Sequence, residues 1–309
     1  MDIEQELANI TPQGETLLTI GVFDGVHAGH RYLLKQLQRQ AAKRDLLSGV
    51  VTFNPHPQSV LHPDDQLPWL SSLEDRVATF GQLALTVVAV LTFTPRVARL
   101  SARDFLSLLK KYLRMQGIVV GPDFVLGRAA EGNIGLLRAL GNEMEFTVKV
   151  IPAYTVNGEI VSSTLIRQAL IQGDMRRVEK LMSRRFYLRG KVITSERRGR
   201  ALGFPTANLD TEPEQALPGN GIYATITQVD GKRFASATNV GTRPTFGEGK
   251  RMVETHLLDY QGDLYGREIK VEFVQKVRDE QRFPSAEQLI TQMRRDIQEV
   301  QAILAGGLG

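Results

Sequence analysis

Short apolar runs alternate with amphipathic patterns up to about residue 180. Runs rich in β-branched and apolar residues predict buried strands at residues 16–23, 49–53, 86–91, 118–121 and 146–151. Between the runs, apolar positions at helical spacing predict helices at residues 29–43, 73–82 and 102–114. Ser71 and Glu74 have the spacing of a capping box for the second helix, and Ser101 precedes the third. This alternation indicates a parallel sheet covered by helices on both sides, in which ligands bind at the carboxyl ends of the strands.

The pattern changes after about residue 185. Strands separated by turn residues such as Asp230 and Gly231 are predicted at residues 187–194, 221–229, 232–239, 253–260 and 268–277. A long helix is predicted at residues 286–304, with Ser285 and Gln288 as its capping box, and a short helix plus link at residues 173–185. We therefore expect an α/β protein of two domains, residues 1–183 with a parallel sheet and residues 184–309 with an antiparallel β-barrel and a long terminal helix.

Composition narrows the class of protein. The 309 residues are 42% hydrophobic and 23% charged, as in ordinary globular domains. No apolar run reaches the roughly 18 to 20 residues that a membrane span needs, and the acidic start of the chain is unlike a signal peptide, so we expect a cytoplasmic protein. The chain has no cysteine, which excludes disulfides and thiolate metal sites. A net charge of +4 is small for this length and predicts no nucleic-acid partner.

The first candidate site lies directly after the first predicted strand. The motif Gly21-Val-Phe-Asp-Gly-Val-His27-Ala-Gly29-His30 places two histidines at the mouth of a helix, whose N-terminus attracts phosphate. Its glycines allow the backbone to approach a ligand closely. The alternative is a pair of turn histidines without chemistry.

Three further segments are expected near this site. Residues 52–57 and 121–127 each follow a strand, although Asn-Pro-His-Pro is also a common turn sequence. Ser162, Ser163 and Arg167 lie at the start of a predicted helix and form a natural cradle for a polyphosphate, with helix capping as the alternative role of the serines.

The second candidate site lies in the barrel half. Thr206 and Asn208 are two residues apart on an extended segment, so their oxygens point to the same side and can share one Mg²⁺. Nothing in that spacing is unique to a metal site, since an ordinary strand start has the same pattern.

These motifs, in this order and spacing, resemble the bacterial bifunctional riboflavin kinase/FAD synthetase family over about residues 17–303. The kinase half of the resemblance rests on residues 203–208, 218–223, 239–246, 254–259, 264–266 and 278–283. The resemblance implies a Rossmann-like nucleotidyltransferase domain followed by a riboflavin kinase barrel. It also implies two reactions: phosphorylation of riboflavin to FMN by ATP, and adenylylation of FMN by a second ATP to give FAD and pyrophosphate.

The resemblance also implies roles for particular residues. His27 and His30 would steady the reacting phosphates, Ser162, Ser163 and Arg167 would hold the leaving pyrophosphate, and Glu254 would be the general base for the ribityl hydroxyl. The remaining ATP or phosphate residues of the adenylyltransferase would be Gly21, Phe23, Asp24, Gly25, Gly29 and Thr164. Flavin or nucleotide would contact Asn54, His56 and Asp123 in that half, and Gly199, Arg200, Gly203, Phe204, Pro205, Asn239 and Arg278 in the kinase half. Thr206 and Asn208 would hold Mg²⁺.

Some positions depart from the family pattern. Residues 183–186 read Ser-Arg-Arg-Phe where Gly-Arg-Pro-Tyr/Phe is common, and residues 194–198 lack a glycine that the nucleotide-covering loop often has. Val22 and Asn54 stand where the family often has polar or acidic residues. A monofunctional FMN adenylyltransferase with a flavin-binding barrel is therefore one alternative, and a non-catalytic flavin sensor is another. For Glu254 the alternative to catalysis is a solvated residue on an edge strand.

Overall fold

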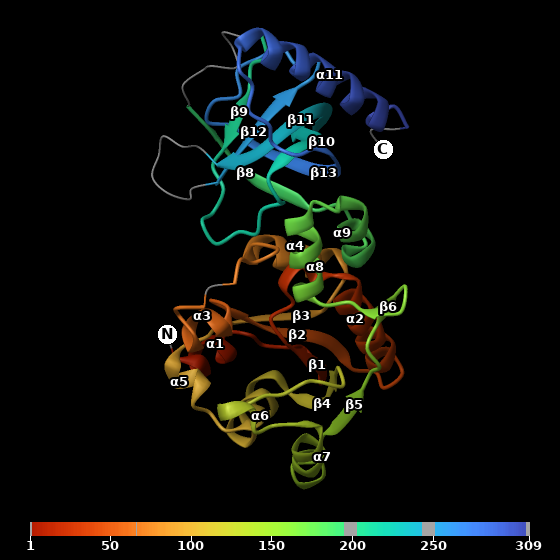
Figure 1. Ribbon diagram of the computed structural model, residues 1–309. Helices are drawn as coiled ribbons and strands as arrows, with labels where there is room; N and C mark the ends of the chain where they lie inside the picture. The colour runs from red at the N-terminus through yellow and green to blue at the C-terminus, as the bar shows by residue number, and fades with distance from the viewer. Residues whose placement is uncertain (1, 66, 195–202, 243–250, 307–309) are drawn as a thin grey trace. The chain divides into compact units, whose positions relative to one another are not determined.

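The computed structural model describes residues 2–65, 67–194, 203–242 and 251–306 (Figure 1). Within it the chain forms two compact units, Met1–Ser163 and Thr164–Gly309. No helix in these ranges is long and apolar enough to cross a membrane.

The first unit is built on a parallel sheet. Its five described strands have the order β3-β2-β1-β4-β5, and every neighbouring pair is parallel. All five are at the predicted places, with ends that differ by a few residues: β1 (Thr16–Ile20), β2 (Leu47–Asn54), β3 (Val87–Thr92), β4 (Met115–Val120) and β5 (Thr147–Val150).

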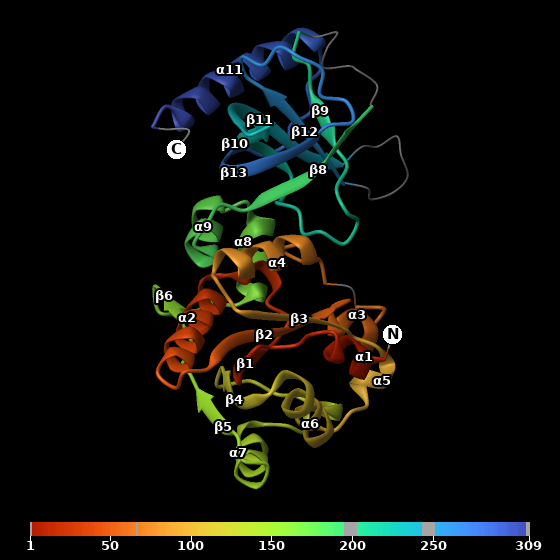
Figure 2. The same cartoon turned by 180° about the vertical axis from the view of Figure 1, so that it is seen from behind.

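Helices cover both faces of this sheet, as the alternating pattern predicts (Figures 1 and 2). Leu17 and Leu18 are neighbours in β1 and therefore point to opposite faces, where Leu17 joins one core cluster with Phe80 and Leu18 joins another with Phe105. The helices of this unit are α1 (Ile3–Ala8), α2 (Ala28–Ala42), α3 (Pro57–Leu61), α4 (Leu73–Gln82), α5 (Pro95–Ala98), α6 (Ala102–Leu113) and α7 (Ile134–Glu143). Short 3-10 turns lie at η1 (Asp24–Val26) and η2 (Arg128–Ala130), and a hairpin joins β6 (Thr155–Val156) to β7 (Glu159–Ile160).

The N-cap of α4 is one residue later than predicted. Ser72, not Ser71, accepts the backbone N–H of Asp75, at 3.0 Å. The Ser71 hydroxyl instead accepts the N–H of Gly25, at 2.9 Å. The predicted capping box of Ser71 and Glu74 is therefore wrong, because a contact distant in sequence takes the Ser71 side chain. Ser101 caps α6 as predicted.

The second unit is a closed antiparallel barrel with helices before and after it. The described strands follow the order β10-β11-β12-β9-β8-β13 around the barrel. Its elements are α8 (Ser163–Gln172), α9 (Met175–Met182), β8 (Tyr187–Ile193), β9 (Ala207–Leu209), β10 (Gly221–Val229), β11 (Lys232–Thr242), β12 (Arg251–Leu257), β13 (Glu268–Arg278) and α11 (Ala286–Leu304). The terminal helix has the predicted bounds, and Ser285 caps it.

Hydroxyl groups fill much of the barrel interior. Five side chains with no exposed surface, Thr225, Thr227, Ser236, Thr238 and Thr255, hydrogen-bond to one another. The oxygens of Thr225 and Thr238 are 2.7 Å apart, for example. Because each hydroxyl has a partner, burial of these polar groups is not penalised as it would be for isolated ones.

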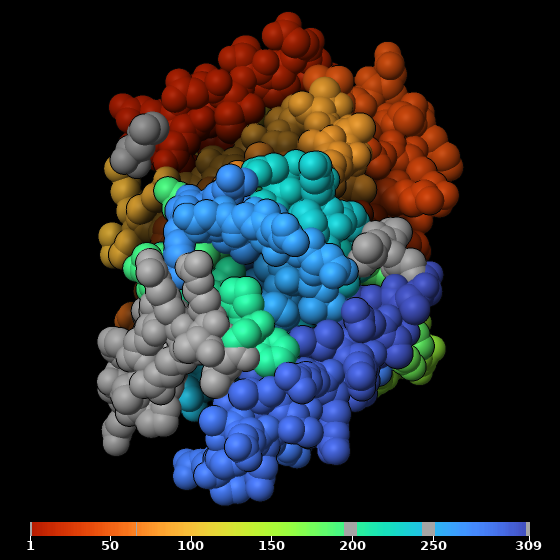
Figure 3. Space-filling model, turned by 90° about the horizontal axis from the view of Figure 1, so that it is seen from above, coloured from red at the N-terminus to blue at the C-terminus, as the bar shows by residue number. Residues whose placement is uncertain are grey.

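The terminal helix covers the outside of the barrel. Val300 and Leu304 of α11 pack with Ala224 and Ile226 of β10, so one apolar cluster of this unit lies between the helix and the strands. The other face of α11 forms a dark blue strip of surface in the space-filling view (Figure 3). This packing adds to the apolar surface that the barrel buries in its interior, where Tyr223 and Phe273 pack together.

Candidate active sites

The turn between β1 and α2 brings the two histidines of the first motif together. Their rings are stacked, with centroids 3.6 Å apart and planes at 16°. His27 is the N-cap of α2, and its Nδ1 accepts the backbone N–H of His30 at 3.3 Å. Since Nδ1 is the acceptor, neutral His27 carries its proton on Nε2. This leaves an N–H donor at the start of the helix, where phosphate is attracted.

Burial keeps both imidazoles neutral near pH 7. It lowers the pKa of His27 to about 4. It also lowers the pKa of His30 well below the ordinary value, with a further contribution from His27. The Nδ1 of His30 is buried and has no hydrogen-bond partner among the residues that the structure describes. A bound polyphosphate would raise both pKa values, because nearby negative charge favours the imidazolium form.

Two glycines of the motif lie where a side chain is unfavourable. Gly25 has φ of 76°, which side chains rarely adopt. A Cβ on Gly29 would lie 3.2 Å from the His27 ring and 3.3 Å from the carbonyl oxygen of Val161. A side chain is therefore disfavoured at Gly25 by the backbone conformation and at Gly29 by tight packing.

Asp24 of this loop hydrogen-bonds to residues distant in sequence, among them Ser163. The buried Asp24 carboxylate accepts the N–H groups of Leu70, at 2.8 Å, and Ser71, at 3.2 Å. The Ser163 hydroxyl donates to the Asp24 carbonyl at 3.2 Å. Ser162 immediately precedes α8, so the serine motif begins beside the histidine loop.

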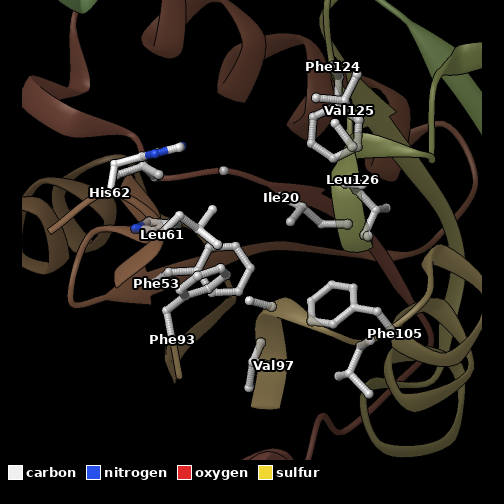
Figure 4. Close-up of a pocket in the computed structure, with 18 residues that line it drawn as sticks. Ile20, Phe53, Leu61, His62, Phe93, Val97, Phe105, Phe124, Val125 and Leu126 are labelled. Carbon is white, nitrogen blue, oxygen red and sulfur yellow. The ribbon is translucent and has the colours of Figure 1, made fainter. Parts of the chain in front are cut away.

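An apolar pocket of about 590 Å³ opens beside this loop (Figure 4). Gly21 and Val22 line it just after β1, and aromatic side chains from β2, from the residue after β3 and from α6 face it. These are Phe53, Phe93 and Phe105, with Phe124, Val125 and Leu126 on another wall and Leu61 and His62 at a further edge. Such a pocket suits a large flat ring system, because rings stack well on aromatic and aliphatic surfaces.

The other predicted residues of this half lie around the pocket or beyond the first unit. Asn54 and Asp123 are exposed next to the pocket residues Phe53 and Phe124. The Nδ1 of His56 accepts the N–H of Gln58 at 3.1 Å and caps α3. Thr164 and Arg167 fall in the second compact unit.

In the barrel, predicted residues far apart in sequence form one row across neighbouring strands. Glu254 on β12 pairs with Asn208 on β9 and with Asn239 on β11. Asn239 pairs in turn with Ile222, and Ile222 with Arg278 on β13. Directly opposite residues on antiparallel strands have Cβ atoms about 4.5–5.5 Å apart and share a face. The register therefore brings an acid and two amides together, and β12 is an interior strand of the barrel rather than an edge.

Asn208 and Asn239 bring buried amide groups to this row. The Asn208 side chain is only 2% exposed. The Oδ1 of Asn239 is buried and has no hydrogen-bond partner in the described part of the chain. An unsatisfied buried oxygen is costly unless a ligand or water completes its bonding.

Thr206 lines a pocket of about 630 Å³ together with Pro205, Thr255 and Tyr265, and no residue of this row lines that pocket. The Nδ1 of His256 lies 2.7 Å from the carbonyl oxygen of Pro205. The ring of Phe204 packs edge-on against the His256 ring. These contacts hold the threonine motif beside β12.

The remaining predicted kinase residues have varied environments. Gly203 has φ of 86°. Arg278 forms an ion pair of 2.7 Å with the buried carboxylate of Asp296 on α11. Gly199 and Arg200 lie outside the described residues.

Two features near the candidate site are absent from the sequence-based prediction. The lining of the apolar pocket comes from separate segments, so no local motif marks it. The second is Arg76, which the sequence pattern could have indicated. Arg76 lies on the buried face of α4 with Thr79 and Phe80, where a charged side chain is unusual.

An α/β unit with a phosphate-attracting histidine loop, joined to a barrel with a carboxylate beside amide and hydroxyl oxygens, defines a phosphate-transferring enzyme with two sites. A family model described as FAD synthetase matches residues 9–165, and one described as riboflavin kinase matches residues 182–304. The chain belongs to the bifunctional riboflavin kinase/FMN adenylyltransferase family.

Relatives of the same family match nearly the whole chain. The Escherichia coli K12 bifunctional riboflavin kinase/FMN adenylyltransferase is 38% identical over 92% of this chain and 91% of its own. The Pseudomonas fluorescens enzyme of the same name is 36% identical over 99% and 98%. A Streptococcus pneumoniae crystal structure described as a macrolide-efflux protein matches with a TM-score of 0.87 and 27% identity, over 96% of each chain.

The protein therefore phosphorylates riboflavin to FMN and adenylylates FMN to FAD, with ATP as co-substrate in both reactions. Since each half matches its own family model, the monofunctional alternative is not favoured.

Proposed function

We propose that adenylyl transfer takes place at the histidine loop, with the flavin ring in the adjoining apolar pocket. The observation that carries this proposal is the adjacency of the two: Gly21 and Val22 belong to the motif and also line the pocket. A flavin ring held there would direct its ribityl phosphate toward the start of α2. That phosphate then attacks the α-phosphorus of ATP, and pyrophosphate leaves.

His27 and His30 stabilise charge in this step. The neutral His27 ring donates its Nε2–H to a phosphate oxygen. The His30 ring is stacked on the His27 ring, with the two ring centroids 3.6 Å apart. As negative charge grows on the oxygens, both rings gain proton affinity, so their hydrogen bonds strengthen in the transition state. Ser162, Ser163, Thr164 and Arg167 are proposed to hold the leaving pyrophosphate, and Asn54, His56 and Asp123 to orient flavin or nucleotide.

We propose that Glu254 is the general base of the kinase. It removes the proton of the ribityl 5′-hydroxyl as the oxygen attacks the γ-phosphorus of ATP. Its place between Asn208 and Asn239 in the row supports the role, because the amides can hold the substrate oxygens on either side of it. Positioning is essential, since a carboxylate is a weak base for an alcohol in water.

Thr206 and Asn208 are proposed to hold Mg²⁺ at the kinase site. A hydroxyl and an amide oxygen are hard donors that fit this ion, and Mg²⁺ is commonly shared between one or two protein oxygens and nucleotide phosphates. When bound, the ion supplies positive charge that offsets the charge of the transferred phosphate.

We also propose that residues 1–183 and 184–309 are the two catalytic domains. The matched ranges 9–165 and 182–304 support this division. The cytoplasmic location and the lack of a nucleic-acid partner stay predictions.

The flavin pocket is tested by placing a charge in it. Val125 lines the pocket and is 50% exposed, so Val125→Asp should leave the fold intact. A carboxylate there should raise the KM for FMN in FAD formation by about tenfold or more, because an aromatic ring would lose apolar contact and meet a charge. Leu136→Asp is the control, since Leu136 is 38% exposed and lies outside the pocket. An unchanged KM in Val125→Asp would place the flavin elsewhere.

A further inference from the structure

A buried arginine holds the backbone at the root of the histidine loop. Arg76, on α4, is only 6% exposed. Its Nη1 donates to the carbonyl of Val22 at 2.6 Å and lies 3.3 Å from the Thr52 hydroxyl. The Thr52 hydroxyl donates to the same Val22 carbonyl at 3.0 Å. A single carbonyl at the carboxyl end of β1 is thus held by two side chains from two other elements.

Keeping this arginine in place has an energetic cost. Burial lowers the pKa of Arg76, and the carboxylate of Asp24 offsets that effect in part. Its Nε is buried without a hydrogen-bond partner among the described residues. An incompletely satisfied buried charge destabilises the fold unless something else requires it. A methionine would fill the space without that cost, so packing alone does not account for the arginine.

The backbone immediately after Val22 is strained. Phe23 and Val26 have φ of 56° and 38°, in the region that side chains disfavour. The Phe23 ring packs against Phe80 of α4, with centroids 5.7 Å apart, and against His30, at 5.1 Å. The same helix therefore holds the loop twice, by Arg76 at the backbone and by Phe80 through the ring that touches a histidine.

We propose that Arg76 is a positioning residue for adenylyl transfer, which fixes the Val22 carbonyl and thereby the strained loop that carries His27 and His30. This inference rests on the proposed role of the two histidines. Arg76 acts through the loop and touches no reacting atom. A strained backbone conformation persists only where surrounding contacts hold it in place. Arg76 provides such a contact at Val22, just before the strained residues.

The inference is tested with Arg76→Met, Arg76→Lys and the control Arg138→Met. Methionine keeps the apolar stem, lysine keeps the charge but lacks the planar fork, and Arg138 is an exposed arginine on α7. Because a displacement of about 1 Å can cost about 10²-fold in rate, we expect Arg76→Met to lower kcat for FAD formation from FMN by about 10- to 100-fold. The KM values for FMN and ATP should change little, since the substrate contacts remain. Arg76→Lys should restore part of the rate.

A second measurement is independent of activity. The chain has five histidines, so their imidazole signals in nitrogen-proton correlation spectra can be resolved. The signals of His27 and His30 should shift in Arg76→Met and stay in place in Arg138→Met. Riboflavin phosphorylation, measured on the same samples, should equal the wild-type rate in all three variants.

Several outcomes would overturn the inference. A wild-type kcat in Arg76→Met with unmoved imidazole signals would show that the loop does not depend on the arginine. Equal loss of both activities would show that Arg76 stabilises the fold rather than the site. His27→Ala and His30→Ala, measured in parallel, separate the two proposals: if both retained the wild-type rate of FAD formation, the proposed role of the histidines would fail, and the positioning role with it.

Discussion

The two sites of this protein are assembled in different ways. In the first unit, the histidine loop is one contiguous segment at the carboxyl end of β1, and residues 70–76 hydrogen-bond to it. In the barrel, Asn208, Asn239 and Glu254 come from three strands and meet only because of their register. In a parallel sheet, functional side chains come together in the loops at the carboxyl ends of strands. In an antiparallel barrel, they come together from neighbouring strands.

The difference has consequences for substitution. A change in the loop affects neighbours that share hydrogen bonds and ring contacts, as His27 and His30 do. A change in the barrel row alters one side chain while the backbone ladder stays in place. Single chemical roles should therefore be separable in the barrel and coupled in the loop.

The largest expected effect is that of Glu254→Gln. Glutamine keeps the shape but cannot accept the proton, so phosphorylation of riboflavin should fall by about 10² to 10⁴-fold. Conversion of added FMN to FAD should continue at the wild-type rate, as measured by chromatographic separation of the flavins. Glu268→Gln, an exposed carboxylate on β13, is the control. A normal kinase rate in Glu254→Gln would exclude it as the base.

Next in size is the loss of either histidine. His27→Ala and His30→Ala should each lower FAD formation from FMN by about 10² or more, comparable to the loss of one transition-state hydrogen-bond donor. FMN formation from riboflavin should persist. Because the two rings are stacked, the double variant should lose much less than the product of the two single effects. Equal loss of both activities would indicate unfolding instead.

The loop should also make the first unit sensitive to acid. The pKa of His27 is lowered to about 4 by burial, so below its unfolded pKa the unfolded chain binds a proton that the folded chain does not. Its neutral form therefore stabilises the fold above about pH 6.5, and this contribution is lost as the pH falls toward 4. Between pH 7 and pH 5 the loss from His27 alone is about 2 kcal/mol.

His27→Asn should abolish that part of the pH dependence. The measurement is urea unfolding of wild type and variant at pH 7 and pH 5, with a signal that reports the first unit. His62→Asn is the control, since His62 is exposed. Identical pH dependence in wild type and His27→Asn would contradict a buried neutral imidazole.

The smallest expected effect concerns the metal. Thr206→Ala and Asn208→Ala should each weaken MgADP binding by about fivefold, since each removes one oxygen donor worth about 1 kcal/mol. Calorimetric titration with and without Mg²⁺ checks this, and the difference between the two titrations should shrink in both variants. Unchanged affinity would remove these residues from the metal site.

Much of the fold is predictable from the sequence because short stretches of the chain contain the patterns that specify its helices and strands. The buried strands, α2, α6 and α11 follow from apolar spacing and caps. The helices α1, α3 and α5 have six, five and four residues, too few for a period to be recognised. The 3-residue β9 is also too short, yet it carries Asn208.

The sites are less predictable because they depend on distant contacts. The histidine motif could be recognised as one string of letters, but Arg76 reaches Val22 only because strand order places α4 over the end of β1. Likewise, Glu254 could be carried over by resemblance, whereas its position between Asn208 and Asn239 requires the barrel register. Local pattern thus identifies the candidate catalytic residues better than the residues proposed to position them.

The central claim is that the two reactions use separate sets of residues at opposite parts of the chain. Its most direct test is to mix Glu254→Gln with His30→Ala and supply riboflavin and MgATP. Neither variant alone should convert riboflavin to FAD at an appreciable rate. The mixture should do so, because FMN made and released by the kinase of His30→Ala is a substrate for the adenylyltransferase of Glu254→Gln. A mixture that forms no FAD, although each variant retains its other reaction, would contradict the account.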